Sequence, residues 1–315
     1  MIRLNESNVT VIIIAKNEGE IIETCLDSIF SQSLKPDEVI VVDGRSTDDT
    51  VEKVQKYPAK IIVEDEGQTS PSNARNLGVN NASSEIVLVM GADAELGPDC
   101  ITNVVKYFED PNVIVVIPTL DIRVHTRLEK VQKAWFWGSR SRLRTPYGTG
   151  SSIQFVKKYV YLKITFDTNF GYGDDSDFRR RMLKVYDPSN IVRAEDVKIL
   201  VDLPHTFSEV AAQFRWYGRT SLTYYTRYHN IGGLIRLTNV LLPSFFIISL
   251  IGIPFFSFGV LISGFLLFLL ILRYLIFCVR SNTLYFLNFM IYDFFRSYYY
   301  VYGILQGLFI KKVGR

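Results

Sequence analysis

The feature that most constrains this chain is a long apolar run near its C-terminus. From Leu237 to Val279, 43 residues contain a single charged side chain, that of Arg273. One crossing of a bilayer takes about 20 predominantly apolar residues. The run therefore predicts two membrane helices, at about 237–255 and 258–279, joined by a turn at Pro254 to Ser257.

A third apolar segment, at about 284–310, is interrupted by two charges. Asp293 and Arg296 lie three residues apart, so on a helix they share one face and can pair. We expect a buried structural pair or an interfacial helix, with contact to a lipid headgroup as the alternative. A full third crossing would place the basic C-terminal residues outside, against the preference of basic residues for the cytoplasm. The sequence leaves the orientation of this segment open.

Charge and cysteine content exclude several classes of protein. Six of the 35 bases and one of the 32 acids lie from Leu237 onward, which leaves 29 bases and 31 acids in the first 236 residues. The net charge of +3 thus comes from the tail, and nucleic acid is not an expected partner. Three scattered cysteines exclude a disulfide framework and a cysteine-rich zinc site. A catalytic region that faces the reducing cytoplasm fits this composition.

The first 120 residues alternate between two hydrophobic periods. Continuous β-branched runs are typical of strands buried on both faces, and apolar residues at helical spacing follow them. Strands and helices in turn predict an α/β fold with a parallel sheet and crossover helices. The expected strands are Val9–Ala15, Glu38–Asp43, Lys60–Glu64 and Glu85–Met90, with a helix around Ser72–Asn81.

Ligands of such sheets bind beyond the carboxyl ends of the strands. Three segments follow predicted strands and carry polar or acidic side chains, namely Lys16–Glu18, Asp43–Gly44 and Gly91–Ala94. The sequence contains neither G-x-G-x-x-G nor G-x-x-x-x-G-K-[ST], so the common dinucleotide and P-loop interpretations lose their main support.

Six segments are each weak as motifs but specific in their combined order. They are Val9–Glu18, Val39–Thr50, Asn73–Gly78, Val87–Pro98, Gly171–Arg181 and Gln213–Thr220. Together they resemble an inverting glycosyltransferase of family 2 with the GT-A fold, over about residues 8–230. The resemblance implies a catalytic domain over 1–230 with a mainly parallel central sheet. Residues 231–315 resemble the membrane tail of bacterial and archaeal members that build surface polysaccharides or lipid-linked glycans.

The resemblance assigns the first loops to the nucleotide of a nucleotide-diphospho-sugar donor. Asp43 matches an acid that binds the nucleotide base, and a carboxylate suits the hydrogen-bond donors of base and ribose. Ala15 and Glu18 belong to the first nucleotide-contacting loop. Arg75 matches an arginine that pairs with the nucleotide or with a carboxylate of the site. The structural alternatives are a turn acid for Asp43, an acid at a helix start for Glu18 and a solvated helix residue for Arg75.

Residues Gly91–Pro98 occupy the place of the family's acid-x-acid metal motif, although Gly91 stands where many members have the first acid. Asp93 remains as a metal ligand, and Glu95 offers a second oxygen unless it is simply a charged turn residue. Hard oxygen ligands suit Mg²⁺ or Mn²⁺, which offsets the charge of a diphosphate leaving group. His205 is a further candidate ligand, because a late histidine completes the metal site in some GT-A enzymes. A lone histidine is more often structural.

The acidic cluster within Gly171–Arg181 resembles the family's acceptor-site motif. Asp175, the second acid of the pair, is then the general base that takes the proton from an acceptor hydroxyl as its oxygen attacks the anomeric carbon. Asp174 positions the acceptor or the base, and two adjacent carboxylates raise each other's pKa. The alternative is a group of acids at the N-terminus of the helix that carries Phe178, which is compatible with catalysis.

The segment Gln213–Thr220 resembles a glutamine-arginine-tryptophan element near the diphosphate and acceptor. Gln213 and Arg215 are therefore site candidates, since a guanidinium can hold phosphate through two hydrogen bonds. The aromatic and basic residues around them equally suggest an interfacial belt before the membrane. Between the halves, Arg123–Arg144 carries seven bases and one acid. We interpret it as an amphipathic helix on the bilayer that covers the acceptor site, with a solvated loop as the alternative.

These inferences predict a multi-pass membrane glycosyltransferase with its active site on the cytoplasmic face. It transfers a sugar, with inversion, to a hydroxyl of a lipid-linked glycan or another membrane-proximal acceptor. The main alternative is a polyprenyl-phosphate sugar synthase, whose acceptor phosphate is already ionised and needs no strong base. A non-catalytic nucleotide-sugar-binding scaffold is a third alternative, which Gly91 supports and the retention of Asp93 and Asp175 opposes. Processive synthesis is disfavoured, because two or three crossings leave little to build a channel.

Overall fold

The computed structural model describes residues 7–139, 153–228, 231–253 and 258–309, which belong to two compact units. Of the described residues, the first unit contains 7–123 and 153–202, and the second contains 124–139, 203–228, 231–253 and 258–309. Within these ranges, the last boundary between the two compact units therefore lies between Asp202 and Leu203, ahead of residue 230. The functional boundary expected at that residue remains a prediction.

The described part of the first unit contains one eight-stranded sheet. Its strands are β1 (Val9–Ala15), β2 (Glu38–Asp43), β3 (Lys60–Val63), β4 (Ile86–Gly91), β5 (Ala94–Leu96), β6 (Val115–Ile122), β7 (Gln154–Lys157) and β8 (Ile191–Val201). They lie in the order β3-β2-β1-β4-β7-β6-β8-β5. The predicted parallel core is confirmed over β3, β2, β1 and β4. The far half is mixed, because β7 is antiparallel to β4 and β6, and β5 is antiparallel to β8.

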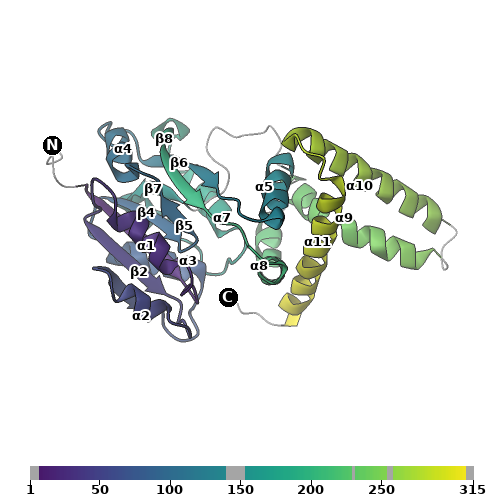
Figure 1. The fold of residues 1–315 in the computed structure, drawn as a ribbon, viewed down its shortest axis with the longest axis horizontal. Coiled ribbons are helices and arrows are strands. Elements are labelled where there is room, and N and C mark those ends of the chain that lie inside the picture. Colours follow the sequence, from purple (N-terminus) through teal and green to yellow (C-terminus); the bar gives the residue numbers. More distant parts are fainter. Residues whose placement is uncertain (1–6, 140–152, 229–230, 254–257, 310–315) are drawn as a thin grey trace. The chain divides into compact units, whose positions relative to one another are not determined.

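Helices cover both faces of this sheet (Figure 1). They are α1 (Ile22–Phe30), α2 (Thr50–Val54), α3 (Pro71–Asn81), α4 (Cys100–Tyr107), α6 (Lys158–Lys163), α7 (Asp174–Met182) and the 3-10 helix Pro188–Asn190. Val11 and Ile13 of β1 pack with α1 and α4, whereas Ile12 packs with α3, α6 and α7 on the other face. Because neither face of β1 meets water, its sequence is an unbroken β-branched run.

The parallel strands place their following loops at one edge of the sheet. Ala15 at the end of β1 lies opposite Asp43 at the end of β2, and Ile14 lies opposite Gly91 at the end of β4. The strand order reverses direction between β1 and β4, which is where ligands of such sheets bind. The three polar segments noted after the predicted strands therefore meet at this edge.

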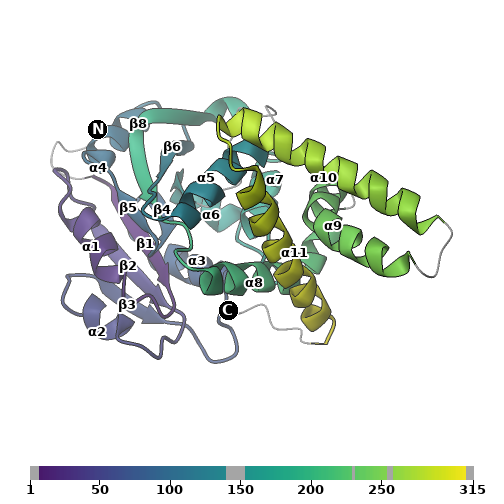
Figure 2. The same cartoon turned by 45° about the vertical axis from the view of Figure 1, so that its right-hand side comes forward.

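The described part of the second unit is helical. Its helices are α5 (Arg127–Ser139), α8 (Phe207–Arg227), α9 (Ile231–Gly252), α10 (Gly259–Ser281) and α11 (Phe286–Phe309). Helices α8 and α11 pack closely, and α10 contacts α5, α9 and α11 (Figure 2). A Cβ atom at Gly303 of α11 would overlap the backbone carbonyl oxygen of Arg215 on α8. Glycine at this position therefore permits the close approach of the two backbones.

Membrane-spanning capacity is smaller than the sequence predicts. Among the described residues, one helix, α10, is long and apolar enough to cross a bilayer. The apolar part of α9 covers only Val240–Ile251, and α11 buries two charged side chains against its neighbours. The expected multi-pass arrangement over 237–255, 258–279 and 284–310 is therefore not supported. Apolar residues in α9 and α11 also pack against other helices. Hydrophobicity alone does not distinguish such residues from residues that contact lipid.

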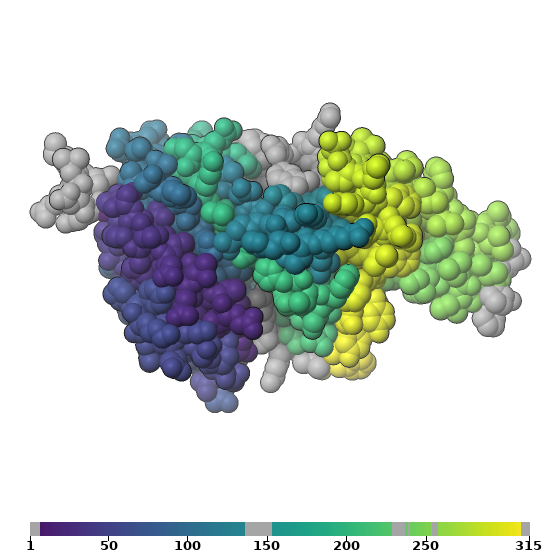
Figure 3. All heavy atoms as spheres, viewed as in Figure 1, coloured from purple at the N-terminus to yellow at the C-terminus, as the bar shows by residue number. Residues whose placement is uncertain are grey.

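Helix α10 presents a long apolar surface. Val260, Leu261 and Phe265 are 63%, 69% and 61% exposed. The spheres of α10 lie on the outside of the second unit (Figure 3). The expected turn at Pro254 to Ser257 and the basic residues from Lys311 onward lie outside the described residues.

Asp293 is the centre of a buried polar cluster in the second unit. Its carboxylate accepts hydrogen bonds from Arg296 Nε at 2.6 Å, Arg273 Nη2 at 3.1 Å and the Tyr274 hydroxyl at 3.0 Å. The Arg296 guanidinium also lies 4.1 Å from the centroid of the Trp135 ring, a cation–π contact. The expected pair of Asp293 and Arg296 is thus formed and buried, and two arginines share its single carboxylate.

Candidate functional site

Asp43 ends β2 and is almost fully buried, with 2% of its surface exposed. Ser46 donates to both carboxylate oxygens, from its N–H to Oδ2 at 3.0 Å and from its hydroxyl to Oδ1 at 2.5 Å. The N–H of Gly44 donates to the carbonyl of Ala15 at 2.8 Å, which joins the ends of the two strands. The carboxylate of Asp43 is therefore held in one orientation at the edge where β1 and β2 end.

The loop after β1 is fastened to the loop after β2. The N–H of Asn17 donates to the Ser46 hydroxyl at 2.9 Å, and the N–H of Glu18 donates to the Thr50 hydroxyl at 2.9 Å. These bonds fix the backbone on which the Glu18 side chain stands. The structure thus brings Ala15, Glu18 and Asp43 together at one edge of the sheet.

Glu64 directly follows β3 and was not predicted as a site residue. Its N–H donates to the carbonyl of Asp43 at 2.9 Å. Its carboxylate is 3% exposed and accepts from Asn73 Nδ2 at 2.7 Å and from the Ser70 N–H at 3.2 Å. Burial raises the pKa of Glu64, and these hydrogen bonds and the charge of Lys16 partly oppose the rise. The signal for Glu64 was its place immediately after the third parallel strand.

Asp93 lies in the turn that joins β4 to β5, and its side chain is exposed. Its Oδ1 lies so close to Gly91 that a Cβ atom at residue 91 would overlap it. The carboxylate of Asp93 therefore extends over residue 91, which the resemblance aligns with the first acid of the metal motif. Glycine at residue 91 leaves the room for it.

Glu95 is engaged by Arg123, a residue that the sequence reasoning did not assign to the site. Arg123 Nη1 lies 2.6 Å from Glu95 Oε1, and its Nε and Nη2 donate to the two oxygens of Asp202 at 2.9 and 2.5 Å. The N–H of Asp202 donates to the carbonyl of Asp93 at 2.9 Å. The hydrogen bonds to Asp202 and then to Glu95 raise the pKa of Arg123. Arg123 thus ties the turn that carries Asp93 to the end of β8.

The charges of three candidate acids influence the pKa of one buried thiol, that of Cys25. Burial raises the pKa of Cys25 on α1, and the negative charges of Asp93, Glu95 and Glu18 raise it further. The three carboxylates therefore lie within electrostatic range of Cys25. Because Arg123 neutralises Glu95, the negative charges of Asp93 and Glu18 are the ones that favour a nearby cation.

A divalent cation at this edge would need ligands in addition to the described protein side chains. Within the residues that the structure describes, no group of three or more His, Cys, Asp or Glu side chains could hold a metal ion alone. Mg²⁺ commonly binds through one or two carboxylates together with substrate phosphates and waters. The solvent-facing carboxylate of Asp93 is of this kind. Glu95 already neutralises Arg123 and is less suited to the role.

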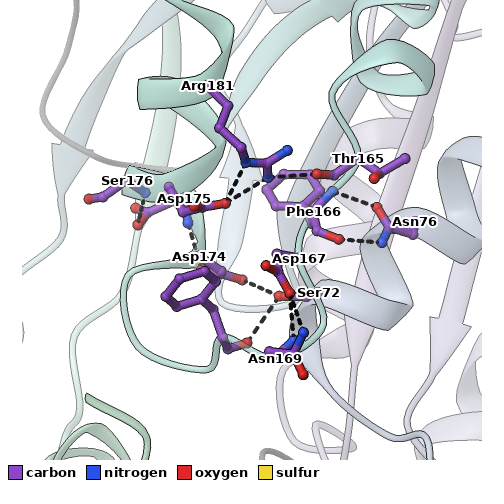
Figure 4. A network of polar contacts seen from close by, with 12 residues as sticks. Ser72, Asn76, Thr165, Phe166, Asp167, Asn169, Asp174, Asp175, Ser176 and Arg181 are labelled. Carbon is purple, nitrogen blue, oxygen red and sulfur yellow. Dashed lines mark hydrogen bonds and ion pairs between the residues drawn. The ribbon is translucent and has the colours of Figure 1, made fainter. Parts of the chain in front are cut away.

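Arg75 on α3 points to Asp174 at the start of α7. Its Nη1 forms an ion pair with Asp174 Oδ2, and both side chains are buried. The Ser72 hydroxyl lies 3.0 Å from the same oxygen (Figure 4). Arg75 therefore pairs with a carboxylate of the site in this structure.

The first turn of α7 carries Asp174 and Asp175, two acids that are adjacent in the sequence. Asp174 Oδ1 accepts the N–H of Asp175 at 2.8 Å, and Asp175 Oδ1 accepts the N–H of Ser176 at 2.6 Å. Burial and the charge of Asp174 raise the pKa of Asp175 to about 6, against the opposing charge of Arg75. Such a carboxylate accepts a proton more readily than an ordinary aspartate and is still mostly ionised at neutral pH.

His205 belongs to the second unit and is partnered there by Glu129. Its Nδ1 lies 2.7 Å from Oε1 of Glu129, which is fully buried on α5. Burial alone would raise the pKa of Glu129, but hydrogen bonds from the His125 N–H, the His205 ring and Thr126 lower it to about 2. The ionised carboxylate of Glu129 therefore fixes the orientation of the His205 ring.

Gln213 and Arg215 both lie on α8, also in the second unit. Two residues apart on a helix, they are separated by about 200° around its axis and point in different directions. Arg215 is exposed, whereas Gln213 is partly buried. The structure therefore does not bring these two side chains together on one face.

The helix expected within Arg123–Arg144 corresponds to α5, which begins at Arg127 and ends at Ser139. Helix α5 contacts α10 and α11 and buries Val131 and Ala134. Residues 140–144 lie outside the described residues. Contact of this helix with a bilayer remains a prediction.

The first part of this chain is similar in sequence to known proteins. The family model described as Glycosyl transferase family 2 matches residues 10–177. The dolichyl N-acetyl-alpha-D-glucosaminyl phosphate 3-beta-D-2,3-diacetamido-2,3-dideoxy-beta-D-glucuronosyltransferase of Methanococcus voltae is 24% identical over 216 residues, which are 58% of this chain and 65% of that protein. The poly-beta-1,6-N-acetyl-D-glucosamine synthase of Staphylococcus aureus (strain COL) is 25% identical over 174 residues, 53% of this chain and 42% of that protein. The chain thus spans less than two thirds of the length of these relatives.

The fold is shared with a solved enzyme. The mannosyltransferase PcManGT from Pyrobaculum calidifontis, in complex with GDP-Man and Mn²⁺, superposes with a TM-score of 0.60 and 21% identity. The match covers 96% of this chain and 87% of that one. The predicted α/β fold of GT-A type is confirmed by this likeness.

Proposed function

Because the chain belongs to glycosyl transferase family 2, we propose that it transfers a sugar, with inversion, from a nucleotide-diphospho-sugar to a hydroxyl group of a lipid-linked glycan or another membrane-proximal acceptor. The observation that carries the proposal is the environment of Asp175, whose pKa is raised to about 6 beside Asp174. Asp43 and Asp93 belong to the same compact unit. The name of the relative from Methanococcus voltae includes a dolichyl-linked sugar phosphate, which supports a lipid-linked acceptor.

Asp175 acts as the general base. Its carboxylate takes the proton of the acceptor hydroxyl while the hydroxyl oxygen forms a bond to the anomeric carbon of the donor sugar. The bond between that carbon and the diphosphate oxygen breaks, and the nucleoside diphosphate leaves with the electron pair. Attack from the face opposite the diphosphate inverts the configuration of the sugar.

Residues at the ends of β1 and β2 hold the donor nucleotide in this proposal. The buried carboxylate of Asp43, oriented by Ser46, accepts hydrogen bonds from the base or ribose. Ala15 and Glu18 line the adjacent loop, whose backbone is fixed by Ser46 and Thr50. A carboxylate held in one orientation selects a nucleotide by the geometry of its hydrogen-bond donors.

Asp93 holds a Mg²⁺ or Mn²⁺ ion in this proposal. When bound, the cation offsets the negative charge that develops on the diphosphate leaving group. The similar enzyme from Pyrobaculum calidifontis was solved with Mn²⁺, which supports a divalent cation. Glu95 and His205 as metal ligands, and Gln213 and Arg215 as diphosphate or acceptor ligands, stay predictions.

Helix α10 anchors the enzyme to the cell membrane in this proposal, with the first unit on the cytoplasmic side. The support is the length and apolar surface of α10, the one described helix suited to a crossing. Nucleotide sugars for the first unit and a lipid-linked acceptor then meet at the same membrane surface.

Nucleotide release in detergent tests the proposal, across a panel of UDP-, GDP- and dTDP-sugars with Mg²⁺ or Mn²⁺ and a lipid extract as acceptor. We compare wild type with Asp93→Asn, Asp175→Asn and the control Asp110→Asn, an exposed acid after α4. Consumption of one donor, with the first two variants reduced by about 10²-fold or more and the control unchanged, supports the proposal.

Other outcomes point to other functions. Activity that survives in Asp175→Asn but not in Asp93→Asn indicates an already ionised lipid phosphate as acceptor, as in a polyprenyl-phosphate sugar synthase. Tight nucleotide binding without turnover of any donor, in the presence of lipid extract, indicates a nucleotide-sugar-binding scaffold. Either result contradicts transfer to a hydroxyl group by Asp175.

A further inference from the structure

One face of α3 holds the segment that leads into α7. Ser72, Arg75 and Asn76 lie three and four residues apart, a spacing that places them on one helical face. Asn76 exchanges two hydrogen bonds with the backbone of Phe166, at 2.9 and 2.8 Å. The Arg75 guanidinium lies 5.2 Å from the centroid of the Phe166 ring. This face, part of which is drawn in Figure 4, therefore fixes the chain ahead of the helix that carries the proposed base.

Asp174 connects this face of α3 to the proposed base. Its Oδ2 forms the ion pair with Arg75 and lies 3.0 Å from the Ser72 hydroxyl, while its Oδ1 accepts the N–H of Asp175 at 2.8 Å. Ser72, Arg75 and Asp174 are 0%, 9% and 6% exposed. A buried carboxylate and a buried guanidinium form a neutral pair, and removal of either member leaves an uncompensated charge. That charge would lie beside Asp175.

Asp175 faces charged groups from two elements. On α7, the charge of Asp174 disfavours ionisation of Asp175, whereas Arg179 and the N–H of Ser176 favour it. From α3, the charge of Arg75 favours ionisation of Asp175. Burial is the largest influence and disfavours ionisation of Asp175; among its charged neighbours, Asp174 and Arg75 have the largest and opposite effects.

We propose that Arg75 is a positioning residue for the transfer step: it orients and neutralises Asp174, so that Asp175 stays ionised at neutral pH, and it is not a ligand of the donor nucleotide. Ser72, which is neutral, helps to orient the Asp174 carboxylate through its hydrogen bond and does not change the charge near Asp175. This inference rests on the proposed function, because it requires Asp175 to be the base.

The pH dependence of kcat tests this role, measured as nucleoside diphosphate release by the full chain in detergent with saturating donor and lipid extract. Arg75→Gln leaves the negative charge of Asp174 uncompensated. The acidic limb of the pH profile, where kcat falls because Asp175 becomes protonated, therefore moves to higher pH by about one unit. This shift lowers the rate at pH 6 roughly fivefold. Asp174→Asn removes the repelling charge and leaves Arg75 facing Asp175. Its limb therefore moves to lower pH. General loss of folding does not produce shifts of opposite sign.

Three further variants separate charge from structure. Arg75→Lys keeps the positive charge and should retain a limb near that of wild type. Ser72→Ala removes a neutral hydrogen-bond donor and should lower kcat without moving the limb. Arg193→Gln removes an exposed arginine of β8 and is the matched control, with kcat and limb unchanged.

Two results would overturn the proposal. One is an acidic limb of Asp174→Asn that lies at the same pH as that of wild type. This result is sufficient by itself if Arg75→Gln does not fold. The other is an Arg75→Gln enzyme whose limb is unmoved while its Kd for the donor, measured by calorimetry, rises tenfold or more. Failure of the proposed function is distinguishable, because Asp175→Asn then keeps its rate and wild type shows no acidic limb near pH 6.

Discussion

Arg75 and Asp174 lie 99 residues apart in the sequence and form a buried ion pair in the structure. The pair joins α3, which follows β3, to the first turn of α7. An intact buried pair contributes little net stability, because desolvation of the two charges offsets their attraction. Its effect is on geometry and charge, since it places one neutralised carboxylate next to that of Asp175, the proposed base.

The first prediction concerns the pH dependence of the wild-type enzyme. Asp175 must be ionised to accept a proton, and its pKa is raised to about 6. Activity is therefore fully present well above pH 6 and falls as the pH drops through about 6. Initial rates between pH 4.5 and 8.5 at saturating donor check this, with Kd for the donor measured at each pH. Rates that stay constant down to pH 5 would contradict the role of Asp175.

The second prediction concerns Gly91 and the metal. A methyl group at residue 91 would displace the Asp93 carboxylate that now extends over it. Gly91→Ala should raise the Mn²⁺ concentration for half-maximal activity by roughly 10-fold. Removal of metal with EDTA should abolish wild-type activity, and Mg²⁺ or Mn²⁺ should restore it. An unchanged Mn²⁺ dependence in Gly91→Ala would show that the position of Asp93 does not matter for metal binding.

The third prediction concerns the contact between α8 and α11. In Gly303→Ala the new Cβ meets the backbone carbonyl of Arg215, which cannot move without shifting the helix. We expect a loss of roughly 1–3 kcal/mol in unfolding free energy. Gly264→Ala on α10 is the matched control, because a Cβ there meets no atom within 4 Å. Its helix should be unchanged or more stable by about 0.5–1 kcal/mol. Chemical denaturation in one detergent compares the two variants, and equal effects would contradict the close contact.

The fourth prediction concerns the cluster around Asp293. Asp293→Asn leaves Arg273 and Arg296 buried without a compensating charge and should cost roughly 3–5 kcal/mol in unfolding free energy. Arg273→Met leaves a neutral pair of Asp293 and Arg296 and should cost much less. The same denaturation experiment ranks the two variants. A larger loss for Arg273→Met would mean that the two arginines do not share the carboxylate as the contacts indicate.

The sheet was predictable because its signals are local. Val9–Ala15 and Glu38–Asp43 are strands with the predicted bounds, since a strand buried on both faces needs an unbroken apolar run. Once the strands were known to be parallel, their following loops had to meet at one edge. That rule selected the segments Lys16–Glu18, Asp43–Gly44 and Gly91–Ala94, within which the family resemblance selected Glu18, Asp43 and Asp93. Applied to the third strand, it would also have pointed to Glu64.

The number of membrane helices was not predictable in the same way. Apolar residues that face lipid and apolar residues that pack against another helix have the same composition. Helix α11 packs closely against α8 through Gly303 and buries Asp293, which the sequence pattern alone does not separate from a crossing segment.

The sequence by itself determined the α/β class, the strand ends that carry polar residues and the pairing of Asp293 with Arg296, because each depends on residues close together in the chain. Only the tertiary structure decided that Arg75 pairs with Asp174 and that Arg123 engages Glu95. It also assigned His205 and Arg215 to a different compact unit from Asp93. Such pairings depend on which loops and helix faces the sheet brings together, and a charged side chain carries no local mark of the partner that it will meet.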